Sequence, residues 1–453
     1  MLNLLRSSDK ESEAAKLSKK FGVQVDTRSP NEVIAHLNKS GVGAVPFISP
    51  GNNLFADRDG DRKSYISIGG TEVIPLAGVS NKSTLLCNEN GQWVSYKSDA
   101  HGFNNPDMSI WQTAGVNIVA LGDSFTQGYC VPPEKSFMGV IRQRYPSTLN
   151  LGIAGNGPLM MLATMREYLD EVKPKIVLWI YCEDNDLVEL QGERKSLLLT
   201  RYLEGDFKQS LLARQTDIDQ AMLEESQRQE EASKSLKQLQ KQENPIVIEE
   251  LKNIARLSAV RSRLNMPHSI EEGELTALAD MEGHNFDVFG QILTQAKSRV
   301  MAANGKLYFV YLPGWARYAK TPQLGLKQRA RVLSMVNSLQ IPIIDIGQVF
   351  DSHKDPLSLF PFSEPGHYNE IGHRLVAEEV VRNLSKDTRR SLIDTHRLDE
   401  TMKEASGGVL TLGRFGSRYT LQAQARRETS WPTQAPNEEA RGGQCIDILN
   451  LSC

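Results

Sequence analysis

The sequence predicts an α/β protein with three layers, α/β/α, around a parallel five-stranded sheet, together with a small N-terminal α+β piece and a helical insertion. From about residue 116, short apolar runs alternate with segments of helical length and periodicity, the pattern of a parallel sheet covered by helices. The apolar runs are continuous, as in PKIVLWIYCED over 174–184, which is typical of strands buried on both faces. Such strand–helix–strand units cross over with the right hand, so we expect helices on both faces of the sheet.

The N-terminal piece, residues 1–115, contains one well-marked helix and several short strands. In RSPNEVIAHLNKSG, Ser29 is a candidate N-cap, Pro30 occupies the first helical position, Glu32 completes a capping box and Gly41 ends the helix. Strands are predicted in AVPFISP, SYISIGG and TEVIPLAG. TLLCNENGQWVSYKS predicts a β-hairpin that turns at Asn90-Gly91.

The α/β domain, residues 116–385, follows with five predicted strands and five predicted helices. The strands are expected within 116–123, 148–155, 174–184, 306–313 and 341–346, and the helices within 134–145, 159–172, 286–304, 326–340 and 369–384. Each strand is followed by a helix, so the strands can all run parallel.

Two segments depart from this alternation. Residues 187–270 are highly charged with few apolar positions, among them Ile218 and Met222, which favours an exposed helical insertion or helical hairpin. A protein partner that binds this insertion is the less favoured alternative. Residues 386–453 mix Gly, Pro, Ser and charge, which predicts a mostly disordered tail.

Composition excludes several classes of function. The 453 residues carry a formal net charge of -3, so nothing favours nucleic acid or an anionic membrane surface. The 5 cysteines are scattered without a CxxC or Cys/His cluster, so we expect neither a zinc site nor a disulfide framework. No signal peptide or membrane-spanning run is found. The chain as written is therefore expected in the cytoplasm, and an upstream anchor would place it outside.

Polar residues gather where the predicted strands end. Gly122-Asp123-Ser124 follows the first strand, Gly155-Asn156-Gly157 the second and Glu183-Asp184-Asn185-Asp186 the third, and FPFSEPGHYNEIGH lies beyond the last. The carboxyl ends of parallel strands meet at one edge of a sheet, where α/β proteins bind ligands. A serine, a histidine, a carboxylate and N–H donors at one edge can carry out acyl transfer.

Each of these residues also has a structural interpretation. Ser124 could be only a helix N-cap, and Gly155 only a tight turn. Asn185 could bond its own backbone in a loop, and His367 could cap or pack beneath its helix. No single residue decides between the two interpretations, but their order and spacing favour the catalytic one.

In combination, these motifs resemble the SGNH (GDSL) hydrolase superfamily, bacterial type. GDSFTQG, NLGIAGNG, EDNDL and EPGHYNEIGH are similar to its four blocks, in the same order, over roughly residues 98–385 around the insertion. The resemblance implies Ser124 as nucleophile, Gly155 as a backbone donor to the oxyanion, Asn185 as a side-chain donor and His367 as base. YKSDAHGFNNP also resembles the lead-in segment of some bacterial members linked to polysaccharide modification.

Two positions depart from the family pattern. Glu364 stands where the family has Asp, three residues before His367. A glutamate can orient a histidine, but its longer side chain requires a shifted backbone, and Asp351 and Asp355 are nearby substitutes. Glu183 stands where many members have Gly, which predicts an extra carboxylate beside the pocket that disfavours acidic substrates.

The leading interpretation is a serine-dependent ester hydrolase of the SGNH type, acting through an acyl-enzyme without metal or organic cofactor. The expected triad is Ser124, His367 and Glu364, and the expected oxyanion donors are the N–H groups of Ser124 and Gly155 and the amide of Asn185. Its substrate would be a small-molecule or glycan ester. One alternative is an O-acetyltransferase or deacetylase that modifies a polysaccharide. Another is a non-catalytic scaffold that uses the fold to bind a partner.

Other chemistries fit the sequence less well. No GxSxG elbow, dinucleotide fingerprint or P-loop is present. His367 and His373 do not share a helix face, so they do not form a metal site, and His373 is expected to be a packing residue. Cys130 and Cys182 are expected to be buried, inert thiols.

Overall fold

The structure, a computed structural model, describes residues 20–22, 24–57, 60–106, 111, 116–241, 272–319, 325–387, 413–415 and 418–420. The chain divides into two compact units, Met1–Ser385 and Lys386–Cys453. In the second unit, residues 386–387 are helical, and the other described residues form one antiparallel pair, β13 (Gly413–Phe415) and β14 (Arg418–Thr420). The rest of the tail that the sequence predicts to be disordered lies outside the described residues.

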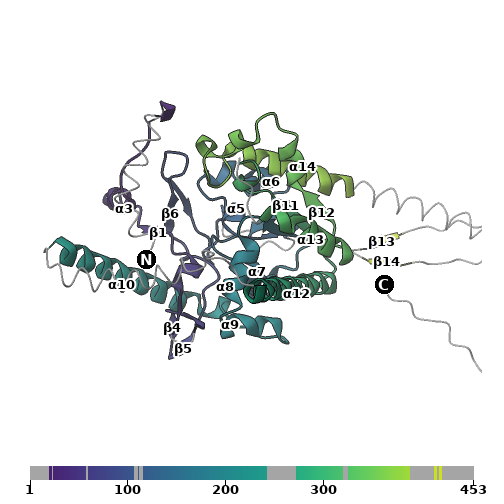
Figure 1. Cartoon of the computed structure of the whole chain (residues 1–453), viewed down its shortest axis with the longest axis horizontal. Helices are drawn as coiled ribbons and strands as arrows, with labels where there is room; N and C mark the ends of the chain where they lie inside the picture. The colour runs from purple at the N-terminus through teal and green to yellow at the C-terminus, as the bar shows by residue number, and fades with distance from the viewer. Residues whose placement is uncertain are drawn as a thin grey trace, which may run out of the picture. The chain divides into compact units, whose positions relative to one another are not determined.

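The centre of the first unit is a five-stranded sheet in the order β12-β11-β10-β8-β9. Figure 1 labels two of these strands, β11 and β12. Every neighbouring pair in this sheet is parallel. The five predicted strands are all present, as β8 (Ile118–Leu121), β9 (Thr148–Asn150), β10 (Ile176–Cys182), β11 (Lys306–Leu312) and β12 (Ile343–Asp345). The predicted α/β class with a parallel five-stranded sheet is therefore confirmed.

Helices cover both faces of the sheet and complete three layers. Successive strand residues face opposite sides: Val119 and Leu121 belong to one apolar core, and Ile118 and Ala120 to the other. The first core includes residues of α7 (Pro158–Val172), α12 (Glu272–Ala302) and α13 (Gly325–Ser338). The second includes residues of α5 (Ser124–Gln127), α6 (Phe137–Arg144), α14 (Ile346–Asp351) and the helix over 370–387.

The chain reverses its direction of travel across the sheet at β8. From β8 it moves outward to β9, then returns to place β10 on the other side of β8. A reversal of this kind opens a crevice at the carboxyl ends of the two inner strands, the usual ligand site of α/β sheets. α5 begins at Ser124, directly beyond the end of β8.

The N-terminal residues form a second, smaller sheet. The helix α3 (Pro30–Lys39) begins at Ser29 with the predicted capping box to Glu32. β1 (Ala44–Pro46), β6 (Ser83–Cys87) and β7 (Val94–Lys97) pair in the order β1-β6-β7, and β6 and β7 form the predicted hairpin. Two short pairs complete this part, β2 (Leu54–Ala56) with β3 (Arg62–Ser64) and β4 (Ser67–Ile68) with β5 (Thr71–Glu72).

The insertion is helical, but its first part is not the exposed element that the sequence predicts. It contains α8 (Asp186–Glu193), α9 (Leu197–Thr200) and α10 (Gln215–Lys241), and residues 242–271 lie outside the described part. Ile218 and Met222 are buried in the same core as the sheet, and Asp219 accepts the backbone N–H of Ser80 at 3.0 Å. The sparse apolar positions of α10 are thus sufficient to dock its first half.

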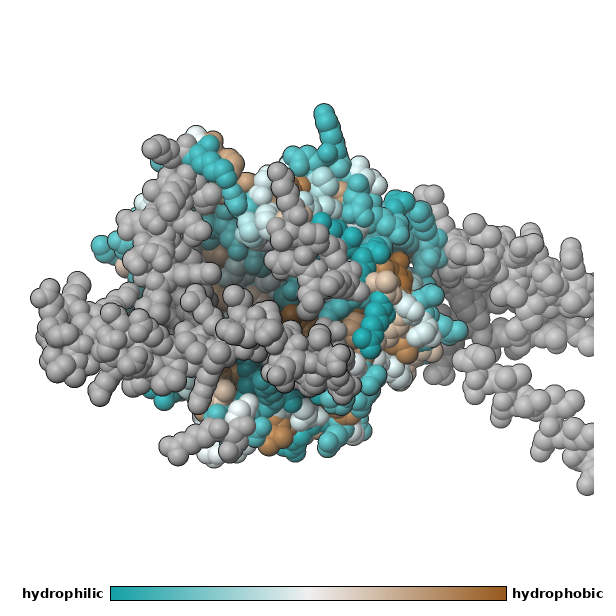
Figure 2. All heavy atoms as spheres, in the orientation of Figure 1, coloured by the Kyte–Doolittle hydropathy of each residue, from teal (hydrophilic) through white to brown (hydrophobic). Residues whose placement is uncertain are grey.

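Single-turn 3₁₀ helices connect several of these elements: η1 (Pro50–Asn53), η2 (Pro133–Lys135), η3 (Arg201–Leu203), η4 (Leu212–Arg214), η5 (Trp315–Arg317), η6 (Pro356–Leu359) and η7 (Pro361–Ser363). On the face seen in Figure 2, hydrophilic residues cover much of the coloured surface and apolar residues form small separate patches. In the part of the chain that the structure describes, no helix has the length and apolar character needed to cross a bilayer.

Candidate active site

Ser124 and His367 meet at the carboxyl edge of the large sheet. Ser124 is the first residue of α5, and Asp123, its N-cap, accepts the N–H of Phe125 at 2.9 Å. His367 lies 243 residues later in the sequence, in the loop before the last helix. The Oγ of Ser124 is 2.7 Å from the Nε2 of His367. The hydroxyl is therefore within hydrogen-bond reach of the imidazole, as nucleophilic catalysis by serine requires.

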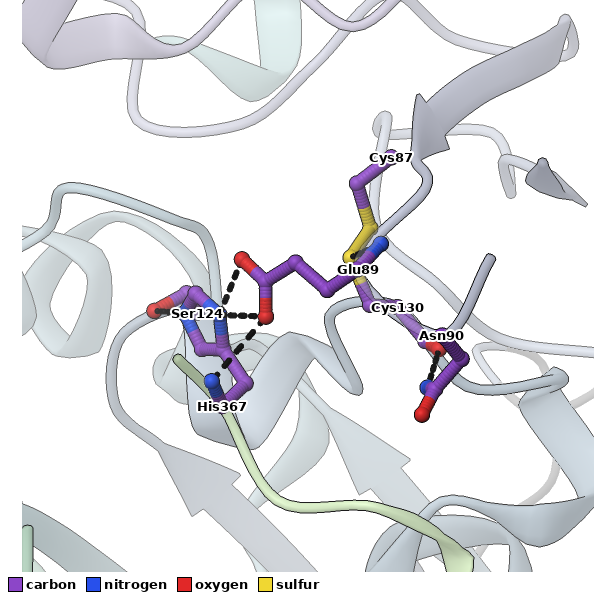
Figure 3. The surroundings of a disulfide bond; sticks show 6 residues. All are labelled: Cys87, Glu89, Asn90, Ser124, Cys130 and His367. Atoms are coloured by element: carbon purple, nitrogen blue, oxygen red, sulfur yellow. Dashed lines mark hydrogen bonds and ion pairs between the residues drawn. A yellow bond between two sulfur atoms is a disulfide. The ribbon is translucent and has the colours of Figure 1, made fainter. Parts of the chain in front are cut away.

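The carboxylate beside His367 belongs to Glu89, not to Glu364. Glu89 lies in the turn of the β6–β7 hairpin, and each of its carboxylate oxygens is 3.0 Å from the Nδ1 of His367. Its Oε2 also accepts the backbone N–H of His367 at 3.0 Å. Figure 3 shows the side chain of Glu89 directed at the imidazole, which in turn contacts Ser124. The three side chains thus form a chain of contacts from carboxylate to imidazole to hydroxyl.

Glu364 instead points to the surface, which differs from the triad that the sequence predicts. Its Oε1 is 2.6 Å from the Nζ of Lys20, and 46% of its side chain is exposed. The backbone explains the difference, because Phe362 and Ser363 both have positive φ angles, 54° and 58°, and turn the chain ahead of Glu364. Asp351 accepts the hydroxyl of Tyr318 at 3.0 Å, and Asp355 is the N-cap of η6.

The sequence pattern offers no signal for Glu89. Its hairpin is predicted correctly from Asn90-Gly91, but no spacing rule connects a hairpin turn to a histidine 278 residues away. Gly366 supplies the space that the carboxylate needs, since a Cβ at this position would lie 3.0 Å from Oε2 of Glu89.

Two aromatic rings hold the imidazole of His367 between them. The ring centroids of Phe125 and Tyr129 are 4.8 Å and 4.7 Å from that of His367, and 19% of the His367 side chain is exposed. Burial lowers the pKa of His367, but the charge of Glu89 and its hydrogen bond raise the pKa, with a smaller contribution from Asp123. The net pKa is above the ordinary value of 6.5, so the site favours the imidazolium that forms when serine loses its proton.

The Gly155 turn brings backbone N–H groups to the same edge. Gly155 has φ +85°, a left-handed conformation that favours glycine, and a Cβ there would lie 2.9 Å from the Oγ of Ser49. Ser49 donates its hydroxyl to the carbonyl of Ala154 at 2.7 Å, so the N-terminal part holds this turn. The N–H groups of Ser124 and Gly155 have no hydrogen-bond partner among the described residues.

The amide of Asn185 is directed at two carboxylates, the buried Asp123 and the half-buried Glu189. Its Nδ2 donates to Oδ2 of Asp123 at 2.8 Å and to Oε1 of Glu189 at 3.1 Å. Burial raises the pKa of Asp123, and burial together with the charge of Asp123 raises that of Glu189 to about 8. These two bonds use both N–H donors of the amide, so the role predicted for Asn185 as an oxyanion donor stays a prediction.

A further buried carboxylate fixes the start of α7, the helix that follows the Gly155 turn. Glu193 accepts the N–H groups of Gly157 at 2.7 Å, Leu159 at 2.9 Å and Met160 at 3.3 Å. Free N–H groups at a helix start favour an anion, although burial raises the pKa of Glu193 to about 7. Glu193, from α8, therefore holds the end of the Gly155 turn and the first residues of α7 in place.

Glu183 does not add the uncompensated charge that the sequence suggests. It forms a two-point ion pair with Arg317, at 3.0 Å to Nε and 2.7 Å to Nη2. The hydroxyl of Tyr311 and the N–H of Gly314 also donate to it, at 2.6 Å and 2.9 Å. With only 1% of its side chain exposed, Glu183 is a compensated structural residue, because all its acceptor capacity is used inside the fold.

The cysteine predictions are half right. Cys182 is a free, buried thiol as expected, and burial raises its pKa well above the ordinary value. Cys130 instead forms a disulfide with Cys87, with the two Cα atoms 5.3 Å apart. The sequence does not indicate this pair, because the two cysteines are 43 positions apart. They meet only when the β6–β7 hairpin packs against the segment that follows α5.

His373 is a packing residue, as predicted. It is fully buried, stacks on Phe137 with centroids 5.5 Å apart, and its Nδ1 accepts the N–H of Phe137 at 3.2 Å. Burial lowers its pKa to about 3. Within the described residues, no group of three or more His, Cys, Asp or Glu side chains is arranged to hold a metal ion.

No family model and no curated protein compared with the chain matches it. Solved structures do match, among them a member of the lipolytic protein G-D-S-L family from Veillonella parvula, 10% identical over 59% of this chain and 96% of that one, with a TM-score of 0.31. A lipase/acylhydrolase from Enterococcus faecalis is 12% identical over 60% of this chain and 96% of that one, with a TM-score of 0.32. The acetyl xylan esterase AlAXEase is 11% identical over 59% and 98%, with a TM-score of 0.31. At these values, any conclusion about function depends on the geometry of the site itself.

Proposed function

We propose that this chain is a serine-dependent ester hydrolase of the SGNH type, with Ser124 as nucleophile, His367 as base and Glu89 as the carboxylate that orients the imidazole. The observation that carries the proposal is the 2.7 Å separation of Ser124 Oγ and His367 Nε2. The two contacts of Glu89 with Nδ1 support it, because they hold the ring with Nε2 facing the hydroxyl.

The reaction follows from these contacts. Ser124 Oγ attacks the ester carbonyl while His367 Nε2 takes its proton, and the imidazolium is stabilised by Glu89. The N–H groups of Ser124 and Gly155 stabilise the oxyanion. Asn185 can act as a third donor only when its amide releases Glu189 or Asp123, which take both of its N–H bonds in the structure. The tetrahedral intermediate then expels the alcohol, which takes the proton from Nε2. Water, activated by the same nitrogen, hydrolyses the acyl-enzyme and restores Ser124.

A short-chain nitrophenyl ester tests the proposal directly. Ser124→Ala is expected to abolish turnover and to leave the melting temperature close to that of the unaltered protein, because the hydroxyl makes one contact at the site. A fluorophosphonate probe should label Ser124 in the folded protein and nothing in the variant. Unaltered turnover by Ser124→Ala would refute the serine mechanism, and a folded protein that neither turns over ester nor reacts with the probe would favour the non-catalytic scaffold.

Transfer of the acyl group to a sugar hydroxyl is the second candidate. A groove of about 790 Å³ lies at the hairpin turn that carries Glu89 and is lined by Trp93, Asn90, Gln92 and Asn369 among others, although Ser124 and His367 do not line it. The aromatic ring of Trp93 suits the apolar face of a sugar, whereas the amide groups of Asn90 and Asn369 already donate to backbone carbonyls. Analysis of the products formed from an acyl donor and a glycan acceptor separates the two reactions, because a transferase yields acylated sugar and a hydrolase only free acid.

A further inference from the structure

The turn that carries Glu89 is joined covalently to the segment that follows the nucleophile. Cys87, at the end of β6, forms its disulfide with Cys130, six positions after Ser124. The N–H of Glu89 lies 3.4 Å from the sulfur of Cys130, and Asn90 Nδ2 donates to the carbonyl of Cys130 at 2.5 Å. Figure 3 shows Cys87, Cys130 and Asn90 on the side of Glu89 that faces away from His367.

This junction connects two separate sheets. Ser124 follows a strand of the five-stranded sheet, whereas Glu89 lies in a hairpin of the sheet β1-β6-β7. No ladder of backbone hydrogen bonds joins these two sheets among the described residues. The distance from the Glu89 carboxylate to the imidazole therefore depends on how the hairpin docks, and the disulfide lies where it docks.

The backbone at Cys130 has an unusual conformation at the point where the disulfide forms. After α5, Gly128 and Cys130 both adopt left-handed conformations, with φ of +84° and +62°. A left-handed conformation is unfavourable for a non-glycine residue and persists where the surrounding structure determines it. At Cys130 the determining contacts are the disulfide and the two hydrogen bonds from the hairpin turn.

We propose that the Cys87–Cys130 disulfide positions Glu89 against His367, so that hydrolysis by this chain depends on the oxidised bond. The inference rests on the proposed function, in which Glu89 orients the base. Cys87 and Cys130 are positioning residues, since the proposal has them act on the reaction through Glu89. A misplacement of about 1 Å at such a group can cost about 10²-fold in rate.

A double-mutant cycle tests this dependence. Cys87→Ser/Cys130→Ser is compared with the unaltered chain, and the same pair of substitutions is compared in a Glu89→Gln background. We expect the serine pair to lower kcat by about 10- to 10²-fold when Glu89 is present, and to change kcat by less than about threefold when it is absent, because contacts that act through one residue are not additive. An equal loss in both backgrounds, or no loss in either, would overturn the positioning role.

The pKa of His367 gives a readout that needs no turnover. Burial lowers this pKa, Glu89 raises it and Asp123 raises it less. The ring of Tyr129 packs on the imidazole, and its hydroxyl stays neutral because burial raises its own pKa to about 12. We expect the His367 imidazole signal, followed by NMR and assigned with His367→Gln, to titrate at lower pH in the serine pair, towards the value in Glu89→Gln. An unchanged titration would contradict the inference. If the proposed function itself is wrong, the unaltered protein will neither hydrolyse the ester nor react with the fluorophosphonate probe. This outcome is distinct from an unchanged titration of His367.

A dithiol reductant tests the same bond in the native chain. Dithiothreitol forms a mixed disulfide with one sulfur and then closes to its cyclic disulfide, so Cys87 and Cys130 each leave as a thiol and two electrons are transferred. Both cysteines are under 9% exposed, so the loss of activity should develop slowly. Cys182→Ala should respond like the unaltered chain, and the serine pair should not respond. A response that persists in the serine pair would assign the effect to another cysteine.

Discussion

Glu89 contacts two groups of His367: Oε2 accepts the backbone N–H at 3.0 Å, and both carboxylate oxygens lie 3.0 Å from Nδ1. One carboxylate thereby fixes both the loop that carries the histidine and the orientation of its ring. Glu89 lies in a hairpin of the small N-terminal sheet, whereas Ser124 follows a strand of the five-stranded sheet. The N-terminal part of the chain therefore contributes one of the three side chains of the candidate site.

The first prediction separates the two candidate carboxylates. Glu89→Gln keeps the size of the side chain but removes the charge that stabilises the imidazolium, so kcat should fall by about 10²- to 10⁴-fold. Glu364→Gln is the matched control, because Glu364 contacts Lys20 at the surface and an exposed ion pair contributes about 0–1 kcal/mol. Steady-state kinetics on a nitrophenyl ester measure both. A large loss in Glu364→Gln with none in Glu89→Gln would return the role to Glu364.

The second prediction concerns the pH dependence of kcat/KM. The base must be neutral to accept the serine proton, so activity should rise with pH through the pKa of His367. Because that pKa is raised above 6.5, the acid limb of the unaltered chain should lie above pH 6.5. In Glu89→Gln, burial still lowers the pKa of His367, but the charge that mainly opposes this effect is gone. The acid limb of the kcat/KM profile should therefore move to lower pH, although the maximum value of kcat/KM falls. Coincident limbs in the two proteins would show that Glu89 does not act on the base.

The third prediction concerns the turn that presents the Gly155 N–H. Ser49→Ala removes the hydrogen bond to Ala154 and should lower kcat by about tenfold, a part of the 10²- to 10³-fold that a whole oxyanion donor contributes. Gly155→Ala should cost more, because its φ of +85° and the 2.9 Å approach of Ser49 Oγ disfavour a side chain. Ser352→Ala is the control: it removes a hydroxyl bond to the carbonyl of Gln348 and should leave kcat unchanged. Equal effects of Ser49→Ala and Ser352→Ala on kcat would remove Ser49 from the site.

The sequence predicts the parts of this site that depend on local pattern. The continuous apolar runs define the five strands, and parallel strands bring their carboxyl ends to one edge, which is why Ser124, Gly155, Asn185 and His367 could be chosen as neighbours. Glu89 could not be found in this way, because its place depends on how one sheet docks beside another. The family pattern favoured Glu364 by spacing alone, and the left-handed backbone at Phe362 and Ser363 turns that residue outward.

Two further predictions were wrong for the same reason, because they concern contacts between segments that are far apart in the sequence. Arg317 lies 134 residues after Glu183, so nothing in the local pattern indicates that the extra carboxylate is compensated. Likewise the apolar positions of α10 are too few to predict burial, yet Ile218 and Met222 reach the main core. In each case the partner is supplied by another segment of the fold.

The last prediction tests the ion pair of Glu183 with Arg317. Glu183 directly follows β10 and lies two residues before Asn185. Arg317→Met should lower the free energy of unfolding by about 3–5 kcal/mol, since it leaves a carboxylate that is 1% exposed without its cation. Lys208→Met breaks the ion pair of Lys208 with Asp170, whose side chains are 34% and 49% exposed, and should cost about 1 kcal/mol or less. Glu183→Gln combined with Arg317→Met should recover part of the stability, because no buried charge then lacks a partner. Urea denaturation measures all three, and equal losses for Arg317→Met and Lys208→Met would mean that the buried pair stabilises the fold no more than a surface pair does.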